Sequence, residues 1–259
     1  MAEVSVYYCF ARSGGTLINR CLGCVSGNFV LSEVNPLSSL AAIESQARDW
    51  LGLIDADGFT RFAARPYGEK ISFLASEVSA RGGRLILRDW PTLNFLNGVY
   101  LDYFFPSGIL EQEVYLDQYA LRRRCAVVSR RSASVYESLR RSFAHLKDLS
   151  IDDFASAYLA YAQSVASFPV IQFEKFCEEP INEFKRLCNT LECHFSDEFV
   201  TAFSSFFNCT GDNSLETVSR GGSSKRILPL ADNRETGAWR SAAADTRCQE
   251  ADAILGYVR

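Results

Sequence analysis

Five short apolar runs alternate with longer stretches of helical periodicity along the chain. The apolar runs occupy residues 4–10, 28–34, 84–89, 125–130 and 168–174. The helix-like stretches occupy residues 16–23, 40–53, 69–80, 133–146, 151–167 and 181–191. Strands that are apolar on both faces and separated by amphipathic helices are typical of a parallel sheet covered on both sides. The pattern therefore predicts an α/β fold with a doubly wound, mostly parallel sheet flanked by helices.

The chain shows no boundary that would divide it. It contains no internal repeat and no low-complexity segment, and its seven prolines are dispersed, so we expect one domain over residues 1–259. No apolar run approaches the roughly 20 residues that span a bilayer. The N-terminal MAEVSVYYCF lacks the basic flank and small-residue cleavage site of a secretory signal. We expect a cytoplasmic protein that does not bind a membrane.

Composition limits the partners further. The nine cysteines are scattered, and several lie inside apolar runs, which is typical of reduced thiols that pack as small hydrophobes. Cys21 and Cys24 form a lone CxxC, whereas a zinc site needs a second pair of ligands, so we expect no metal. The formal net charge of −4 argues against nucleic-acid binding. Any anion site must be local.

Charged side chains fall where the predicted strands end. In doubly wound sheets, ligands bind beyond the carboxyl ends of the strands. Arg12, Glu33, Asp89, Arg130 and Glu174 each lie at or just after such an end. The sequence therefore predicts that these five side chains share one edge of the sheet.

The first strand leads into the sequence FARSGGTLINR (residues 10–20). Small residues that tolerate φ > 0, followed at once by a helix start, aim backbone amides at an anion. The loop departs from the Walker pattern, because Gly15-Thr16 with Arg12 ahead replaces the Lys-Ser/Thr pair, and it is not a GxGxxG loop. A plain turn would look much the same, so this loop needs support from elsewhere in the chain.

That support comes from CAVVSRRSASVYESLRRS (residues 125–142), a strand ending at Arg130 and a helix carrying Ser138 eight residues later. A guanidinium fork and a hydroxyl can converge on one phosphate. Together with the first loop, this pair resembles the sulfotransferases that use 3′-phosphoadenosine 5′-phosphosulfate (PAPS). In that family a [KR]-x-G-T-[TS]-like loop grips the 5′-phosphosulfate, and an R-x7-S strand–helix element grips the 3′-phosphate.

Four further segments resemble the same family, in the family's order. They are VLSEVNPLS (30–38), LILRDWPTLNF (86–96), FPVIQFEKFCEEPINEFKRLCNTLE (168–192) and TGDNSLETVSRGGSSKRI (210–227). The resemblance thus spans most of the chain. It implies a P-loop-like sulfotransferase fold.

The resemblance also implies roles for individual residues. Arg12 would bridge the leaving 5′-phosphate and the transferring sulfuryl group. Arg130 and Ser138 would hold the 3′-phosphate, with Arg220 as a helper. The remaining cofactor-binding residues would supply backbone amides, and Thr16 a hydroxyl, to the 5′-phosphate: Ser13, Gly14, Gly15, Thr16 and Leu17. Arginine replaces the commoner lysine at position 12; it stays protonated, so its role would be electrostatic.

The catalytic base has two candidates. Many family members place a histidine at the end of the third strand, but this chain has Trp90 near that position. Glu33, which resembles the base of glutamate-using members, and Asp89 are the alternatives, because burial can raise the pKa of a carboxyl toward the working pH. Glu33 could instead cap the following helix, and Asp89 could orient Arg88. For His145 and His194 we expect structural or surface roles.

The leading hypothesis is a PAPS-dependent sulfotransferase that acts in line on a hydroxyl or amine of a small-molecule acceptor, such as a bacterial natural product, without a metal. The aromatic segment 92–120 is either core or the wall of the acceptor pocket. One alternative is a nucleotide kinase or NTP hydrolase that uses ATP and Mg²⁺, with RLILRD as its acidic strand. Another is a non-catalytic nucleotide-binding module.

Overall fold

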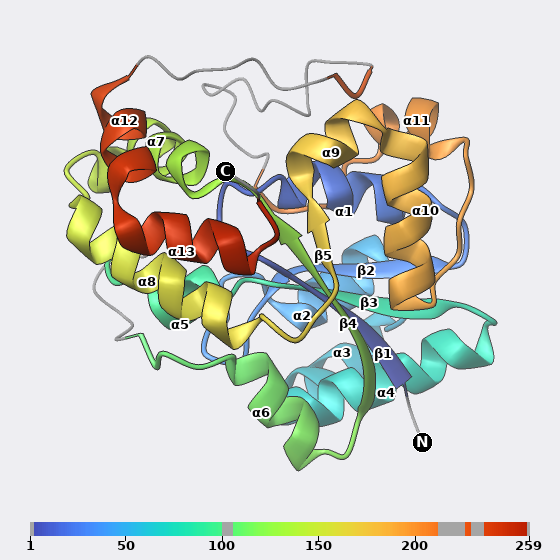
Figure 1. Cartoon of the computed structure of the whole chain (residues 1–259). Coiled ribbons are helices and arrows are strands. Elements are labelled where there is room, and N and C mark those ends of the chain that lie inside the picture. The colour runs from blue at the N-terminus through green and yellow to red at the C-terminus, as the bar shows by residue number, and fades with distance from the viewer. Residues whose placement is uncertain (1–2, 100–105, 212–225, 229–235, 258–259) are drawn as a thin grey trace.

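The structure is a computed structural model, and it describes residues 3–99, 106–211, 226–228 and 236–257. Its centre is a five-stranded parallel sheet with the strand order β2-β3-β1-β4-β5 (Figure 1). The strands are β1 (Glu3–Cys9), β2 (Asn28–Val34), β3 (Arg84–Asp89), β4 (Arg122–Ser129) and β5 (Val170–Gln172). Helices lie on both faces, which confirms the predicted α/β, doubly wound architecture.

The described helices connect the strands and complete the C-terminal part of the chain. The α-helices are α1 (Gly15–Gly23), α2 (Ile43–Ser45), α3 (Ala56–Ala63), α4 (Tyr67–Ala80), α5 (Thr92–Phe95), α6 (Glu111–Gln118), α7 (Ser132–Ser142), α8 (Ile151–Ser164), α9 (Phe173–Glu178), α10 (Pro180–Leu191), α11 (Phe199–Ala202), α12 (Gly237–Ala244) and α13 (Thr246–Ile254). A π-helical turn, η1 (Gln46–Trp50), and two 3₁₀ turns, η2 (Ala144–Leu146) and η3 (Phe203–Ser205), accompany them. No described helix combines the length and the apolar character that a bilayer span requires.

Alternation along β1 divides the core into two layers. Val4, Val6 and Tyr8 pack into the cluster that contains α8, whereas Tyr7 and Cys9 pack into the cluster that contains α1 and α10. Successive side chains of a strand point to opposite faces. Because β1 is covered on both sides, it is almost fully apolar, which is why the sequence reveals it clearly.

Two strands differ in length from the prediction. Strand β4 begins at Arg122 rather than at Cys125. The three arginines ahead of the apolar run also pair with β1, and Arg122 lies opposite Glu3. Strand β5 stops at Gln172 because helix α9 begins at Phe173. The early end of β5 places Phe173 over the first loop.

The helix predicted over residues 40–53 is shorter, spanning Ile43 to Trp50 as α2 and η1. The buried Gln46 side chain binds both backbone groups of Ser32 in β2, with distances of 2.7 Å from Ser32 N to Oε1 and 2.9 Å from Nε2 to Ser32 O. Within the aromatic segment 92–120, Phe95, Leu96 and Val99 are core. Residues 100–105 of that segment lie outside the described residues.

Strand β1 lies at the point where the sheet changes winding direction. Its neighbours are β3 on one side and β4 on the other, so the chain builds one half of the sheet before it crosses to the other. Crevices for ligands form outside the carboxyl ends of strands at such a switch point. The loop that follows β1 occupies this position.

Candidate active site

The loop between β1 and α1 makes a tight turn at the carboxyl edge of the sheet. Arg12 and Gly14 both adopt left-handed backbone conformations, with φ of 71° and 95°. The Ser13 amide donates to the Phe10 carbonyl over 3.1 Å. A left-handed arginine costs roughly 1–2 kcal/mol, and such strain is concentrated at functional sites. The turn fixes the Arg12 backbone beside the start of α1.

Helix α1 begins without a side-chain cap and without an acidic residue in its first turn. The first amides of a helix have no intrahelical partner and carry the positive end of the helix dipole. The amides of Gly15, Thr16 and Leu17 lie in this first turn. The helix start therefore has the geometry and charge of an anion site.

Both glycines of the loop are required by close contacts. A Cβ on Gly14 would lie 2.2 Å from the ring of Phe173. A Cβ on Gly15 would lie 2.8 Å from both Arg88 Nε and Cys9 Sγ. The Arg88 guanidinium thus lies directly against the start of α1, a position that sequence reasoning did not assign to it.

Arg12 reaches across to helix α7. Its Nε donates to Ser138 Oγ over 3.1 Å, and Ser138 is only 2% exposed. The Arg12 guanidinium also lies 5.9 Å from the centroid of the Phe143 ring. The predicted members of two separate phosphate sites, Arg12 and Ser138, are therefore in direct contact.

Arg130 joins this pair from the end of β4. It is 7% exposed, and its Nη1 donates to the Arg12 carbonyl over 3.3 Å. The Tyr158 hydroxyl donates to the Arg130 carbonyl over 2.6 Å and fixes the backbone there. The structure thus brings Arg130 and Ser138 into contact with Arg12.

The charges in this cluster are unbalanced. Burial lowers the pKa of Arg12, and the nearby Arg130 and Arg141 lower it further. Burial likewise lowers the pKa of Arg130, with Glu174 acting in the opposite direction. Both guanidiniums nevertheless stay charged at neutral pH, because arginine is not deprotonated in proteins. Crowded, desolvated cations are stabilised by a bound anion, so the cluster is preorganised for a negatively charged ligand.

Glu33 lies at a bulge of β2 and pairs with Arg88. The β2–β3 register shifts between Leu31 and Val34, and Glu33 has a left-handed φ of 53°. Arg88 Nη2 donates to Glu33 Oε1 over 2.7 Å, and the Glu33 side chain keeps 19% exposure. The neighbouring turn is formed by Asn35, whose Oδ1 accepts from the Leu37 amide. Glu33 is an ion-pair partner rather than a helix cap.

Glu33 and Thr16 face the same small space. A Cβ on Gly211 would lie 2.9 Å from Thr16 Oγ1 and 3.5 Å from Glu33 Oε1. The adjoining Thr210 amide donates to Ser32 Oγ over 3.0 Å. The carboxylate of Glu33 therefore lies beside the first turn of α1, within the part of the site that the loop forms.

Asp89 occupies a different environment. It is fully buried, and burial raises its pKa well above the usual carboxyl value. Asn35 Nδ2 contacts Asp89 Oδ1 at 3.5 Å, and Oδ2 has no hydrogen-bond partner among the described residues. Asp89 therefore lies in an environment that disfavours its charged form, on the face of β3 opposite Arg88.

Two predicted ligands of the loop differ in exposure. Ser13 is fully buried, and its hydroxyl has no hydrogen-bond partner within the described part of the chain. Leu17 is partly exposed.

Arg220, the predicted helper, lies outside the described residues. His145 Nε2 lies 3.0 Å from the Val99 carbonyl, and the His194 ring packs against Gly27.

Comparisons with solved structures identify the fold. The sulfotransferase domain of the Synechococcus PCC 7002 olefin synthase matches with a TM-score of 0.68 and 15% identity, covering 99% of this chain and 95% of that one. The chain has the sulfotransferase fold. The sulfotransferase domain of the curacin biosynthetic pathway matches with a TM-score of 0.61 and 14% identity, covering 100% of this chain and 99% of that one. No family model and no curated protein matches the sequence.

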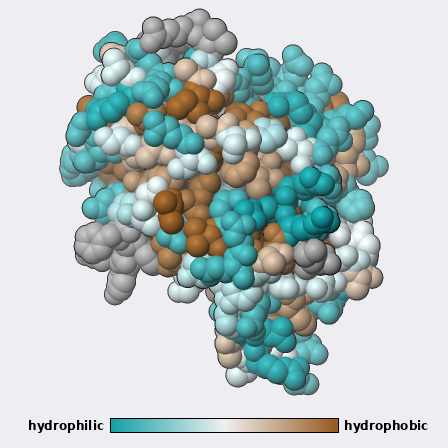
Figure 2. Space-filling model, turned by 60° about the horizontal axis from the view of Figure 1, so that its bottom comes forward, coloured by the Kyte–Doolittle hydropathy of each residue, from teal (hydrophilic) through white to brown (hydrophobic). Residues whose placement is uncertain are grey.

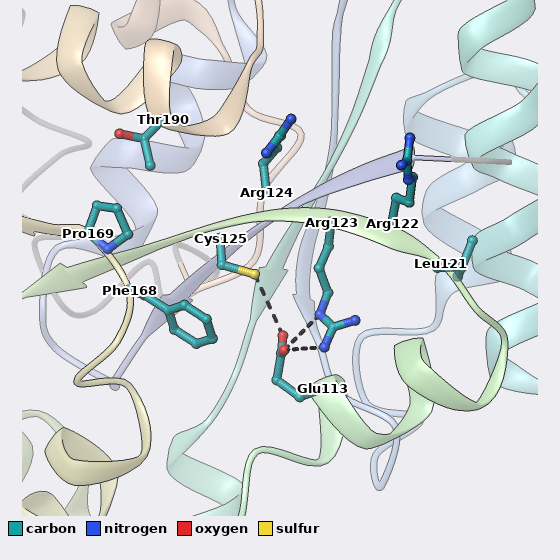
Figure 3. Close-up of a pocket in the computed structure, with 9 residues that line it drawn as sticks. All are labelled: Glu113, Leu121, Arg122, Arg123, Arg124, Cys125, Phe168, Pro169 and Thr190. Carbon is teal, nitrogen blue, oxygen red and sulfur yellow. Dashed lines mark hydrogen bonds and ion pairs between the residues drawn. The ribbon is translucent and has the colours of Figure 1, made fainter.

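A separate pocket of about 630 Å³ lies at the amino ends of the strands (Figure 3). It is lined by Leu121, Arg122, Arg123, Arg124 and Cys125 from β4 and the residue before it, and by Glu113, Phe168, Pro169 and Thr190. Glu113 accepts from Arg123 Nε at 2.7 Å and from the Cys125 thiol at 3.7 Å. Figure 2 shows the underside of the molecule, where a group of hydrophobic residues is surrounded by hydrophilic ones. The pocket lined by Arg122, Arg123 and Arg124 lies at the opposite end of the sheet from Arg12 and Arg130.

Sequence reasoning missed two parts of the site on this sulfotransferase fold. One is Arg88, which precedes Asp89 in β3 and whose guanidinium lies against Gly15 in the first loop. The other is the anchor behind Arg130, where Tyr257 donates to Glu174 Oε2 over 2.7 Å and Glu174 Oε1 accepts from the Arg131 amide over 3.1 Å. Arg88 carried a readable signal, an arginine at a strand end. Tyr257 carried none, because it comes from the far end of the chain.

Proposed function

We propose that this protein transfers the sulfuryl group of PAPS to a hydroxyl or amine of a small-molecule acceptor. The observation that carries the proposal is the contact of Arg12 with both Ser138 and Arg130, beside the uncapped start of α1. Motifs about 118 residues apart in the sequence meet there. A ligand with two separate phosphate groups accounts for both motifs, whereas a plain turn accounts for neither.

The described residues fit such a ligand. Three buried polar atoms near the loop have no hydrogen-bond partner in the described part of the chain: Ser13 Oγ, Arg88 Nε and Arg130 Nε. A buried donor without a partner costs about 1–3 kcal/mol, and phosphate oxygens would satisfy donors of this kind. When bound, PAPS supplies the sulfuryl group and carries the leaving 5′-phosphate.

The binding groups divide between the two phosphates. Arg12 and the backbone amides of residues 13–17, with the Thr16 hydroxyl, would hold the 5′-phosphate and take up negative charge as it leaves. Arg130 and Ser138, aided by Arg220, would hold the 3′-phosphate. Because Arg12 remains protonated, it stabilises charge and donates no proton.

Glu33 is the base that we propose. Its carboxylate and the Thr16 hydroxyl both lie near the Gly211 Cβ position. The Glu33 side chain is also partly exposed, so an acceptor can reach it. Arg88 holds it in one orientation through a 2.7 Å hydrogen bond. Asp89, the second candidate, is fully buried, and burial raises the pKa of its carboxyl, so it would need to gain access to the acceptor before it could act.

Two observations bear on the acceptor and on the kinase alternative. The solved domains that match this fold come from an olefin synthase and the curacin biosynthetic pathway, which supports an acceptor from natural-product metabolism.

A kinase would use the acidic residue of RLILRD to hold Mg²⁺ through oxygen ligands. Asp89 is fully buried and has no exposed oxygen to offer a metal ion, which disfavours that alternative.

A thermal-shift titration tests the proposal directly. Adenosine 3′,5′-bisphosphate, the product of PAPS, should stabilise the protein by about 2.7 kcal/mol at 100 times its dissociation constant. ATP with Mg²⁺ should stabilise it less at the same concentration. The reverse order would support a kinase. Stabilisation by the bisphosphate without turnover of any acceptor, unchanged in Glu33→Gln, would indicate a non-catalytic binding module.

A further inference from the structure

Helix α10 ends in a turn that brings two cysteines together. The Cys193 amide donates to the Cys188 carbonyl over 3.0 Å, and the Glu192 amide donates to the Asn189 carbonyl over 3.3 Å. Glu192 adopts the left-handed conformation, with φ of 50°. This is the Schellman arrangement, in which the first and last residues of the hydrogen-bonded turn place their side chains in contact. Here both of those residues are cysteines.

The backbone bond limits how far apart the two cysteines can be. With standard bond lengths, a 3.0 Å hydrogen bond from Cys193 N to Cys188 O keeps the two Cα atoms within about 7 Å. Natural disulfides join Cα atoms usually about 4.4–6.8 Å apart. Cys188 is buried and Cys193 is partly exposed, and both are free thiols. The turn thus places a shielded thiol beside one that solvent can reach.

We propose that Cys188 and Cys193 are a thiol oxidation site, which a hydroperoxide converts into a reversible disulfide. The site lies on α10, apart from the phosphate-binding loop, and it does not rest on the proposed transferase function.

The two thiols have different parts in the reaction. The thiol–thiol hydrogen bond with Cys193, followed by burial, raises the pKa of Cys188 well above its usual value, so Cys188 stays protonated. Cys193, being accessible, reacts first. Its thiolate sulfur attacks one peroxide oxygen, the O–O bond breaks, and Cys193 sulfenic acid and one water form. The Cys188 sulfur, losing its proton, then attacks the Cys193 sulfur and displaces a second water. In sum, two thiols and one hydrogen peroxide give one disulfide and two waters.

A second cysteine pair, Cys21 and Cys24, is less suited to this chemistry. Cys21 is fully buried within α1, and the Cys24 thiol donates to the Cys21 carbonyl at 3.3 Å. Burial raises the pKa of Cys24 to about 11, which leaves little thiolate near neutral pH. The described residues contain no group of three or more histidine, cysteine, aspartate or glutamate side chains placed to hold a metal ion, so no such group competes for Cys188 and Cys193.

Glu192 lies between the two cysteines and makes the linkage easy to map. Hydrogen peroxide is added to the reduced protein, free thiols are alkylated under denaturing conditions, and the chain is cut after glutamate. We expect two of the nine thiols to be lost and peptides 184–192 and 193–198 to be joined. Dithiothreitol should separate these peptides and release two thiols, and all nine thiols should be recovered when it is added before alkylation. Retention of nine thiols under peroxide would overturn the proposal.

Matched variants complete the test. Cys193→Ser should abolish the linkage, whereas Cys24→Ser, which removes another partly exposed thiol, should leave it intact, as should Cys209→Ser. Circular dichroism and thermal melting confirm that each variant is folded. Loss of two thiols that persists in Cys193→Ser, or a linkage that instead joins Cys21 to Cys24, would contradict the assignment.

Discussion

Arg130 is a buried cation whose Nε has no hydrogen-bond partner in the described structure. Its replacement should remove this unsatisfied donor together with the Nη1 hydrogen bond to the Arg12 carbonyl. We predict that Arg130→Ala weakens binding of adenosine 3′,5′-bisphosphate roughly 10- to 100-fold, since a hydrogen bond to a charged group contributes about 1.5–3 kcal/mol. Binding of adenosine 5′-monophosphate, which lacks the 3′-phosphate, should change far less. Isothermal titration calorimetry measures both, and equal losses would refute the 3′-phosphate assignment.

Glu33 and Asp89 can be separated by isosteric amides. Glu33→Gln should lower kcat roughly 10²- to 10⁴-fold, the usual contribution of a general base, and should leave bisphosphate binding nearly intact. Asp89→Asn should have a small effect on kcat, because Asp89 is fully buried and lies on the face of β3 opposite Arg88. Steady-state kinetics on both variants decides between them. If Asp89→Asn caused the larger loss of kcat, Asp89 would be the base.

The sequence revealed some site residues and hid others for physical reasons. Arg12, Arg130 and Ser138, which the structure brings together, could be proposed as site residues because local strand–loop–helix patterns determine where they lie. The Arg88–Glu33 ion pair was not predicted, because it depends on a bulge that gives Glu33 a left-handed backbone. No local pattern encodes a register shift between two strands that are distant in the sequence. The position of Glu33 was predicted, but its partner was not.

At the level of elements, the fit between α1 and α9 depends on Gly14. This residue combines a φ of 95° with a ring of Phe173 in the place of its missing Cβ. Gly82 is a matched control, because its φ is 72° but nothing lies within 4 Å of its Cβ position. We predict that Gly82→Ala costs about 1–2 kcal/mol of unfolding free energy from backbone strain alone. Gly14→Ala should cost about 1–3 kcal/mol more, from overpacking.

Urea denaturation of the two variants measures this difference. If Gly14→Ala and Gly82→Ala lost the same free energy of unfolding, the Phe173 ring would move away at no cost and the contact would not constrain the loop. The combined variant Gly14→Ala/Phe173→Leu should recover part of the additional loss.

Agreement between the predicted and the observed elements is uneven. The five strands and helices α1, α4 and α10 agree with the prediction to within a few residues. Helices α6 and α13 were not predicted. They carry mostly polar residues, and α13 buries only small side chains, Cys248 and Ala251. Tertiary packing stabilises such helices without leaving an apolar stripe in the sequence.

For the molecule as a whole, the distribution of charge matters more than its sum. The chain carries a net charge of −4, which by itself would repel an anionic nucleotide. The arginines at the carboxyl edge reverse this locally, because charges are screened beyond about 8 Å at physiological ionic strength. Arg122 and Arg130 lie at opposite ends of β4, about 26 Å apart for eight residues at 3.3 Å each. Arg122 should therefore contribute almost nothing to ligand binding.

Arg141 and Arg122 provide a test, because removing either changes the net charge equally. Arg141 is half-exposed and close enough to lower the pKa of both Arg12 and Arg130. Arg141→Ala should weaken bisphosphate binding roughly 2- to 5-fold at 0.15 M salt, as expected for a partly screened charge, and the effect should shrink at 1 M salt. Arg122→Ala should leave affinity unchanged at both concentrations. Equal effects of the two variants at 0.15 M would show that net charge, and not the arginine cluster, governs attraction of the nucleotide.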